Sequence, residues 1–524
     1  MVSKGRAAIA GVVAAAVALG VAELVAVFTG PRSAPLIAVG GVVVDSAPEP
    51  AKQFAIALFG VHDKTALLVG TGILLALFAA LIGIGANLDR MYGYLGIGLF
   101  AAIGVAAALT RPHATWIAVL PTLIGSALAL FVLVRLLHLA VAVAESPPRD
   151  LGVVVGDSPD SGVSSPPELQ DRRGFVKWTA GIAVVAGVVG LGGRWLASRR
   201  TAELARSDVK LPAPANPAQP LPQNVDLAIA GLARYVTSNR DFYRIDTALV
   251  TPQVDPESWT LKIHGRVRNP FTLTFEQLLA RPMVERYVTL ACVSNEVGGD
   301  LISNARWLGV PVKEILAEAD PEPGADQVVS RSVDGWTCGT PTAVLSDGRD
   351  ALLAVGMNGE PLPVEHGFPV RMVTPGLYGY VSACKWLTEL ELTSFADFDA
   401  YWIRRGWSAQ GPIKTQSRID VPRSNAKVPA GEVVVAGVAW AQHRGITVVE
   451  VSTDNGVSWR QAELAGTVSP DTWRQWMLRW QATPGRYTLM VRAADTTGMV
   501  QSEQRVPVVP DGAEGWHTIT VTVT

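Results

Sequence analysis

Hydrophobic residues are concentrated in the first 200 positions of this chain, where long blocks of Ala, Val, Leu, Ile and Gly are broken only by short polar segments. A helix needs about 20 residues to cross the roughly 30 Å hydrocarbon layer of a bilayer. Four blocks reach that length, at residues 7–29, 65–86, 92–110 and 114–143. We therefore expect residues 1–145 to form an all-α bundle of four transmembrane helices.

A fifth apolar block, residues 175–193, follows a polar linker at 146–174 that is rich in Ser, Pro and Asp. Five spans would leave the two ends of the chain on opposite sides of the membrane. The positive-inside rule assigns one side to the cytoplasm, the side that carries Lys4, Arg6, Arg90, Arg149, Arg172 and Arg173. Four arginines after the last block favour the opposite orientation: Arg194, Arg199, Arg200 and Arg206. Such charges have little influence on a translocated folded domain.

Two adjacent arginines, Arg172 and Arg173, stand directly before the fifth block in the sequence Asp-Arg-Arg-Gly-Phe-Val-Lys. This segment resembles a twin-arginine signal, which exports folded, cofactor-loaded proteins across the bacterial inner membrane. Arginines before a span are also what ordinary membrane topology requires. Either interpretation predicts a multi-pass protein of the bacterial plasma membrane, with a fifth span at 175–196 and residues 200–524 on the extracytoplasmic side.

Outside the apolar blocks, the composition is that of an ordinary water-soluble protein. The 524 residues carry a formal net charge of −2 without a Lys/Arg-rich arm, so a nucleic-acid partner is not expected. Three cysteines, Cys292, Cys338 and Cys384, are too few for a disulfide scaffold and show no Cys-x-x-Cys spacing. The sequence has no iron–sulfur motif, and His138 has no second histidine at matching depth, so neither an iron–sulfur cluster nor a haem is expected.

The polar part of the chain begins with a Pro-rich connector at 197–224 and continues with two differently patterned segments. Residues 225–408 mix short apolar strands with short helices, which is typical of an α+β domain. The strands are expected at 259–265, 287–292 and 369–373, and the helices start near Thr274 and Val312.

Residues 409–524 alternate apolar and polar positions instead, with turn signals roughly every ten residues. The expected strands are at 432–440, 447–452, 486–492 and 518–523. This spacing predicts a C-terminal β-sandwich.

One cysteine lies where a predicted strand meets a flexible loop. Cys292 ends the apolar run 287–291, and Asn295, Gly298 and Gly299 follow it. A thiolate in that position is a soft donor that can bind a transition metal or attack an electrophile. From this fragment alone, a buried structural thiol is an equally good interpretation, because free cysteine is often a small core residue.

Six motifs give the middle segment a resemblance to the sulfite oxidase family of molybdopterin-dependent oxidoreductases, in a membrane-anchored bacterial form. They are 290–295 (LACVSN), 304–311 (NARWLGVP), 357–363 (MNGEPLP), 366–371 (HGFPVR), 375–376 (PG) and 385–386 (KW). The C-terminal segment looks like that family's immunoglobulin-like dimerisation domain at 452–459 (STDNGVSW), Trp473, Trp476 and 492–498 (RAADTTG). The resemblance implies a three-part architecture: a transmembrane bundle, an α+β molybdopterin domain at 225–408 and an immunoglobulin-like β-sandwich at 409–524.

The resemblance also implies a molybdenum–molybdopterin cofactor and the residues that hold it. Cys292 occupies the family's molybdenum-ligand position. His366 and Arg371 match positions that bind the pterin phosphate, for which arginine offers a bidentate fork. Five further residues are expected in the same pocket, the first three by looser alignment: Tyr243, Arg244, Asp334, and then Ser382 with Ala383. Lys385 completes the set, and Arg306 is expected beside Cys292 as the catalytic residue that faces an anion.

The sequence departs from the family where substrate specificity is decided. Segment 332–341 has no tyrosine, and Asn295 and Glu296 stand where animal and plant sulfite oxidases carry arginines. Loss of positive charge weakens the case for a small dianion, because binding one in a dry pocket needs paired charge. We expect a small oxyanion or a sulfoxide-like substrate, a separate electron-transfer partner or quinone, and a homodimer.

Two alternatives stay open at this point. The exported part is also compatible with a catalytically silent, membrane-tethered interaction module. Cys338 and Cys384 both border the expected pocket, and in an oxidising compartment they either pair as a disulfide or remain separate buried thiols.

Overall fold

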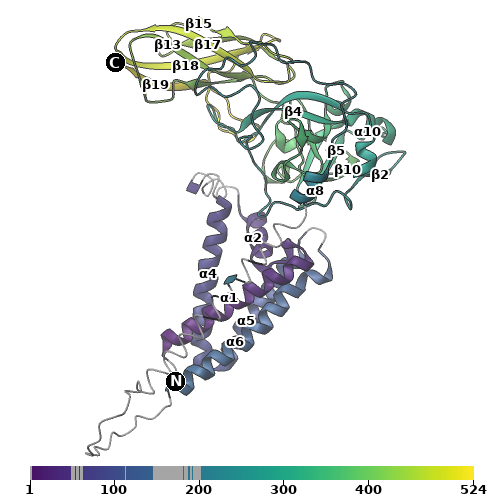
Figure 1. The fold of residues 1–524 in the computed structure, drawn as a ribbon, viewed down its shortest axis with the longest axis vertical. Helices are drawn as coiled ribbons and strands as arrows, with labels where there is room; N and C mark the ends of the chain where they lie inside the picture. Colours follow the sequence, from purple (N-terminus) through teal and green to yellow (C-terminus); the bar gives the residue numbers. More distant parts are fainter. Residues whose placement is uncertain are drawn as a thin grey trace, which may run out of the picture. The chain divides into compact units, whose positions relative to one another are not determined.

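The computed structural model describes residues 3–48, 54, 58–59, 63–111, 114–144, 181, 184, 187–188, 192 and 202–524. The chain forms two compact units, residues 1–200 and 201–524, each considered by itself below (Figure 1). The predicted linker at 146–174 and the twin-arginine segment lie outside the described residues. So does most of the predicted fifth span.

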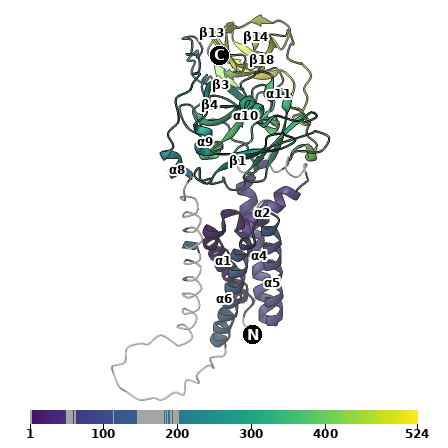
Figure 2. The same ribbon diagram turned by 90° about the vertical axis from the view of Figure 1, so that its right-hand side faces the viewer.

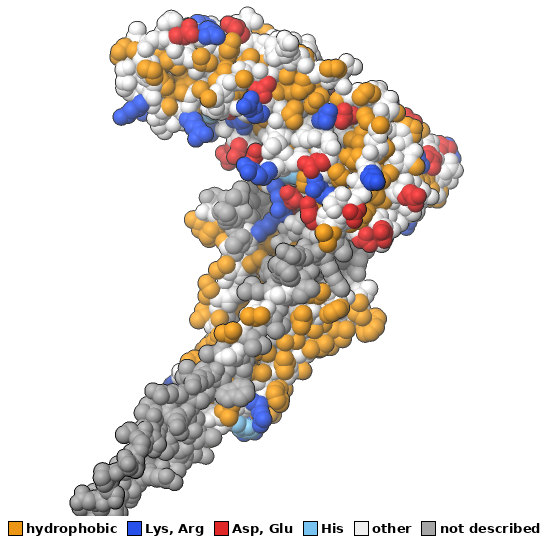
Figure 3. Space-filling view, in the orientation of Figure 1, with side chains coloured by type: hydrophobic (Ala, Val, Ile, Leu, Met, Phe, Trp, Pro, Cys, Tyr) orange, Lys and Arg blue, Asp and Glu red, His pale blue; other side chains and the backbone are white. Residues whose placement is uncertain are grey.

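The first unit contains the four apolar helices that the sequence predicts. They are α1 (Lys4–Thr29), α4 (Asp63–Leu88), α5 (Arg90–Leu109) and α6 (Leu120–Ala144) (Figure 2). By length and composition, these four helices could cross a membrane. Large side chains such as Leu77, Phe78 and Leu81 are exposed on them, and Figure 3 shows an apolar surface with few charges over this unit.

A fifth helix, α2 (Pro35–Ser46), was not predicted, because 12 residues are too few for a span. It packs against α5, and its Asp45 forms a 3.0 Å ion pair with Arg111 just beyond the end of α5. Gly41 makes room for this pair, since a Cβ at that position would lie 2.5 Å from the Arg111 guanidinium.

Glycines allow the long helices to approach closely. A Cβ on Gly11 of α1 would lie 2.0 Å from the carbonyl oxygen of Ala79, and one on Gly83 of α4 would lie 2.1 Å from that of Ala7. Gly125 of α6 meets Ala18 of α1 in the same way, at 2.6 Å. In a lipid environment helices associate by such close packing, because burial of apolar surface gives no advantage over lipid contact.

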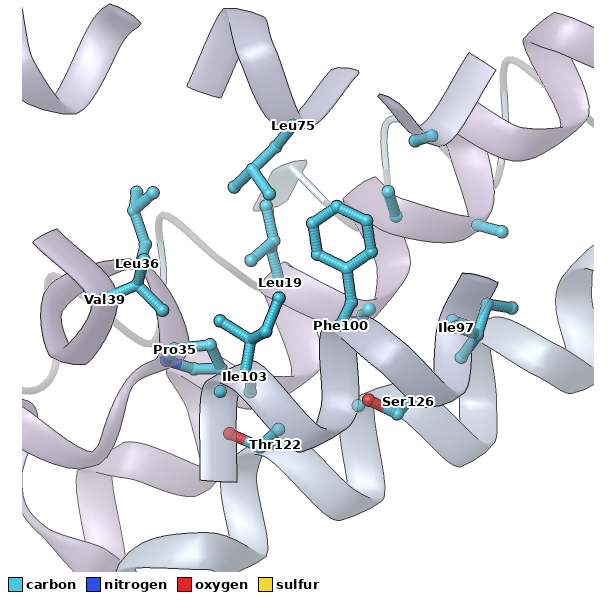
Figure 4. Close-up of a pocket in the computed structure, with 18 of the residues that line it drawn as sticks. Leu19, Pro35, Leu36, Val39, Leu75, Ile97, Phe100, Ile103, Thr122 and Ser126 are labelled. Carbon is cyan, nitrogen blue, oxygen red and sulfur yellow. The ribbon is translucent and has the colours of Figure 1, made fainter. Parts of the chain in front are cut away.

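The same small residues leave a cavity of about 160 Å³ between the helices (Figure 4). Its α1 wall is made almost entirely of glycine and alanine, including Gly11, Ala14, Ala18 and Ala22.

The second unit begins with two mixed layers that carry the α+β pattern. One sheet has the order β2-β1-β10-β5-β6 and the other β3-β4-β7-β8, with β9 paired to β7. The strands of the first sheet are β1 (Thr260–Gly265), β2 (Phe271–Thr274), β5 (Gln327–Ser332), β6 (Thr337–Pro341) and β10 (Leu387–Thr393). Those of the second are β3 (Val284–Ala291), β4 (Ile302–Pro311), β7 (Leu352–Met357), β8 (Glu360–Pro361) and β9 (Arg371–Val373).

Both helices predicted for this region are present. Helix α9 (Phe275–Leu279) begins with a capping box between Thr274 and Gln277, a local signal that satisfies two backbone N–H groups. Helix α10 (Val312–Ala319) buries Ile315 and Leu316 in the core that the first sheet shares with β4, β7 and β9.

The C-terminal residues form two further sheets whose strands lie mostly antiparallel. Their orders are β11-β13-β17-β16 and β12-β19-β18-β14-β15. The first comprises β11 (Gln416–Val421), β13 (Gly431–Trp440), β16 (Glu463–Leu464) and β17 (Arg474–Ala482). The second comprises β12 (Ala426–Val428), β14 (Ile446–Ser452), β15 (Arg460–Gln461), β18 (Gly485–Asp495) and β19 (His517–Val523).

Alternate residues of these strands meet in one core, with Val435 and Trp476 from one sheet against Val449 and Leu489 from the other. The region is therefore β-rich and two-layered, as the alternating pattern predicts. Its likeness to immunoglobulin domains stays a prediction.

Gly437 tests this packing, because a Cβ there would lie 1.8 Å from the backbone oxygen of Arg418 and 2.7 Å from the Trp476 ring. Neither can move without shifting a strand. We expect Gly437→Ala to lower the free energy of unfolding by about 2 kcal/mol. Thermal unfolding of the full-length protein in detergent measures the effect. Val434→Ala, at a half-buried position of the same strand, is the control, and equal melting temperatures for the two variants would contradict the packing.

Candidate functional site

Cys292 follows the last residue of β3 and is buried. Its N–H donates to the carbonyl of Leu301 at 2.9 Å, which closes the loop between them. The Asn295 side chain holds the same loop, accepting the Leu301 N–H at 2.8 Å. Burial raises the pKa of the Cys292 thiol. The thiol is therefore fixed in a dry place at a strand end.

The C-terminal sheets brace the strand that carries this thiol. The side-chain oxygen of Thr289, three residues before Cys292, accepts the Trp473 N–H at 2.8 Å. Gln442 donates to the Thr289 carbonyl at 3.1 Å. Arg418 donates to the carbonyl of Gly299 in the loop at 2.7 Å. Strand β3 and its loop are thus held by both parts of the second unit.

Two tyrosines flank the thiol. Tyr243 and Tyr378 both interact electrostatically with Cys292, and burial raises the pKa of each hydroxyl well above its usual range. Gly379 lies close to both Tyr243 and the end of β3, since a Cβ there would be 3.8 Å from the Ala291 carbonyl and 3.9 Å from the Tyr243 hydroxyl. Tyr243 was predicted. Tyr378 was missed, because its segment is remote from Cys292 in sequence and carries no metal- or anion-binding motif of its own.

Arg371, the first residue of β9, is a buried cation without an acidic partner. Its guanidinium donates to the carbonyl oxygens of His366 at 3.1 Å and Met372 at 3.4 Å, and it lies 5.1 Å from the Trp307 ring centre. Within the described part of the chain no carboxylate forms an ion pair with it. Burial lowers the pKa of Arg371 to about 10, so it stays charged at neutral pH. A buried cation of this kind is costly unless an anion joins it.

His366 lies beside this cation as a neutral ring. Burial and the charge of Arg371 lower the pKa of His366 to about 4. Its Nε2 is 3.0 Å from the carbonyl oxygen of Asn239, and Phe242 contacts the ring edge-on at 5.4 Å. The neutral imidazole hydrogen-bonds the Asn239 carbonyl without adding a second charge next to Arg371.

Lys385 supplies a second buried cation, this one paired. Its Nζ lies 2.8 Å from Asp246 and donates to the Glu365 carbonyl at 3.1 Å. Arg244 reaches the same carboxylate at 3.0 Å from a half-exposed position. Burial lowers the pKa of Lys385 to about 8. Sequence reasoning identified Arg244 and Lys385 but missed Asp246, the residue that joins them.

Ser382 and Ala383 lie in the turn that leads from Tyr378 to Lys385. The Ser382 hydroxyl donates to the Tyr378 carbonyl at 2.9 Å. The Ala383 N–H donates to the Gly379 carbonyl at 3.0 Å. Both groups therefore stabilise the turn itself, and their predicted role as cofactor donors stays a prediction.

The structure does not bring Arg306 to Cys292. Arg306 of β4 pairs with Tyr287 of β3, five positions before the thiol, or roughly 17 Å along the strand. Its guanidinium forms a 3.2 Å ion pair with Glu285. The register of β3 and β4 decides this distance, and the motif around Arg306 does not contain that information. The geometry therefore does not support a catalytic role for Arg306.

Asp334 lies in the turn between β5 and β6, where its carboxylate accepts the Trp336 N–H at 3.1 Å. It acts electrostatically on Cys384, which immediately precedes Lys385. Cys384 and Cys338 are both buried free thiols in side-chain contact with each other. Asp334 thus lies at the edge of the cluster formed by Arg371, His366 and Lys385 rather than beside Arg371.

The two buried cations and the thiol fit a phosphate-bearing cofactor with a metal that binds a thiolate. Arg371 and Lys385 are buried cations, and Arg371 needs an anion. Among the described residues, no group of three or more His, Cys, Asp or Glu side chains could hold a metal ion. A metal at Cys292 would therefore take most of its ligands from a cofactor, and a thiolate is the ligand type that soft metals prefer.

Comparison with known proteins identifies the class. Residues 248–402 match the family model "Oxidoreductase molybdopterin binding domain", and residues 408–524 match "Mo-co oxidoreductase dimerisation domain". Tyr243, Arg244 and Asp246 fall just before the first match. The second unit is thus built as a molybdopterin-binding oxidoreductase.

Individual relatives specify the family further. Mouse mitochondrial sulfite oxidase is 31% identical over 342 residues, which cover 55% of this chain and 62% of that protein. The uncharacterized oxidoreductase YuiH of Bacillus subtilis is 36% identical over 30% of this chain and 76% of its own length. The catalytic subunit MsrP of a protein-methionine-sulfoxide reductase from Burkholderia mallei is 29% identical over 43% of this chain and 71% of its own length. The chain belongs to the sulfite oxidase family of molybdopterin-dependent oxidoreductases, although it spans less than two thirds of the mouse enzyme.

The burial of His366 predicts a dependence of stability on pH. Its pKa is about 4 in the folded protein and about 6.5 in the unfolded chain, so the unfolded state binds more protons below pH 6.5. The free energy of unfolding should fall as the pH decreases from 6.5 to 4, by up to about 3 kcal/mol from this residue. Melting temperatures across that range measure the loss.

His366→Gln should reduce this loss, because the titrating group is gone. Buried His517 has a similarly lowered pKa of about 4 and will leave part of the slope in place. Val434→Ala, which removes no titrating group, is the control and should keep the full slope. If the melting temperature of His366→Gln depends on pH as steeply as that of the wild type, His366 is not the cause of the lost stability.

Proposed function

We propose that this protein is a membrane-anchored, molybdopterin-dependent oxidoreductase in which the Cys292 thiolate is the protein ligand of molybdenum. It would move an oxygen atom onto or off a small substrate and exchange electrons with an external carrier. One observation carries the proposal. A buried thiol at a strand end lies in the same cluster as Arg371, a buried cation that lacks an acidic partner.

Different residues of the cluster would contact different parts of the cofactor. Arg371 and Lys385 provide positive charge for the pterin phosphate, with Asp246 fixing the position of Lys385. Neutral His366 donates its one N–H to the Asn239 carbonyl, so its other ring nitrogen is free to accept a hydrogen bond from the pterin. Buried Tyr243 and Tyr378 help to keep water from the thiol. When bound, the cofactor would supply a two-electron centre that can carry an oxygen atom.

An uncharged sulfoxide fits this site better than sulfite. Segment 332–341 contains no Lys or Arg. Arg306 is paired with Glu285 and lies away from the thiol. A dianion in a dry pocket needs compensating charge, whereas a sulfoxide needs only a hydrogen-bond donor. The relatives named for sulfite oxidation and for methionine-sulfoxide reduction make both substrates the natural ones to compare.

The four apolar helices support an anchor in the bacterial plasma membrane. Lys4 and Arg6 at the start of α1 and Arg90 at the start of α5 mark cytoplasmic ends under the positive-inside rule. We infer an extracytoplasmic position for residues 225–524. The match of residues 408–524 to a dimerisation domain supports an immunoglobulin-like β-sandwich that joins two copies of the chain.

Replacement of the thiol tests the metal ligand. Cys292→Ser should lose at least tenfold in dye-linked turnover of methionine sulfoxide, because the thiolate ligand is gone, whereas molybdenum content should fall much less, because the cofactor supplies most of the ligands. Cys338→Ser makes the same change at a buried thiol on β6 and should keep both. Elemental analysis and cofactor extraction from the full-length protein measure the content. A wild-type protein that folds without molybdenum would instead favour the silent interaction module.

Removal of the unpaired cation tests the phosphate site. Arg371→Ala should lower cofactor content several-fold while the cofactor-free protein melts at the same or a higher temperature, because an uncompensated buried charge has been removed. Arg331→Ala on β5, which breaks an ion pair with Glu391, is the control and should leave cofactor content unchanged. Full cofactor content in Arg371→Ala would place the phosphate elsewhere.

A further inference from the structure

We propose that the cavity among the helices of the first unit binds the ring headgroup of a neutral isoprenoid quinone. All five described helices of the unit contribute to its wall, and every lining residue is uncharged. The occupant must therefore be neutral as well, since a charge there would have no partner.

The two sides of the cavity differ in bulk. The α1 side presents mostly small residues, such as Ala14, Ala15 and Ala18, with Leu19 as its one large side chain. Helix α5 presents Ile97, Phe100 and Ile103, which Figure 4 shows with Leu19. A volume of about 160 Å³ is close to that of an engineered apolar cavity that holds one aromatic ring. The space is thus suited to a flat ring that lies between Phe100 and the small residues of α1.

Three hydroxyl residues, Thr71, Thr122 and Ser126, line the cavity, and Thr122 is the one whose buried hydroxyl is left without a partner among the described residues. Thr122 belongs to α6 and is 4% exposed. A buried hydroxyl without a partner is unfavourable, so a ligand with an acceptor oxygen is preferred over a plain hydrocarbon chain. A quinone carbonyl on a ring meets this requirement, whereas the acyl chain of a lipid does not.

The inference stands apart from the molybdenum assignment, because all its residues belong to the first unit. It concerns binding alone, and quinone binding and molybdenum content are measured separately. Failure of either proposal would leave the other intact.

The experiment uses the full-length protein in nanodiscs of a defined phosphatidylcholine, with the single-ring, fully substituted tetramethyl-1,4-benzoquinone as the probe in calorimetric titrations. Thr122→Val should weaken binding about tenfold, the usual upper effect of one hydrogen bond. Ala15→Leu should abolish binding, because the new side chain fills the ring space. Thr110→Val, outside the cavity at the end of α5, and Ala16→Leu, on α1 but not in its wall, are the matched controls.

Loss of binding in the two cavity variants but not in the controls, with helicity and melting temperature kept, supports the site. Quinone that co-purifies with wild-type protein and is absent from Ala15→Leu supports it independently of the titration. Absence of probe binding to the wild type, or equal binding by all variants, would overturn it. Labelling of the cavity by a photoreactive acyl phospholipid, without competition from the probe, would overturn it in favour of a lipid chain.

Discussion

The second unit contains one buried positive charge, on Arg371, that no carboxylate among the described residues neutralises. Arg371 is held by two backbone carbonyls and the face of Trp307, so its position is fixed although its charge is unpaired. This charge explains the ionisation and pairing of the neighbouring side chains. His366 stays neutral, and Lys385 needs Asp246 because a second free cation would repel the first. Among the described residues, Arg371 is left as a buried cation that a bound anion would stabilise.

The thiol is positioned by elements from both halves of this unit. Strand β3 brings Cys292 to the loop, and the C-terminal sheets hold that strand through Thr289 and the loop through Gly299. A domain whose family model is named for dimerisation therefore also stabilises the site. Substitutions in the C-terminal sheets that weaken their contact with β3 would therefore shift the thiol without contacting it directly.

The first unit uses small residues for two purposes. Gly11, Gly83 and Gly125 let helix backbones touch, which is how helices associate in lipid. Some of the same residues, among them Gly11, Gly125 and Ala18, also line the cavity beside Thr122. Close packing and a binding space thus arise from one choice of residues on α1.

Much of this protein can be predicted from local sequence. Helix length follows from the number of consecutive apolar residues, and the strand ending at Cys292 and the capping box at Thr274 are encoded within a few positions. Family motifs predict one pocket for Cys292, His366, Arg371 and Lys385. The last three interact with one another, and Tyr243 acts on both Arg371 and Cys292. Each of these signals is short-range, or is a motif that can be read without knowing which strands pair.

Tertiary structure alone decided the rest. The pairing of β3 with β4 moves Arg306 away from the thiol, and chain folding brings Asp246 to Lys385 and Tyr378 to Cys292. The contact of Cys338 with Cys384, and the short helix α2, are likewise absent from any local pattern. Strand register and long-range packing depend on the sum of many weak contacts, and no single segment of the sequence contains that sum.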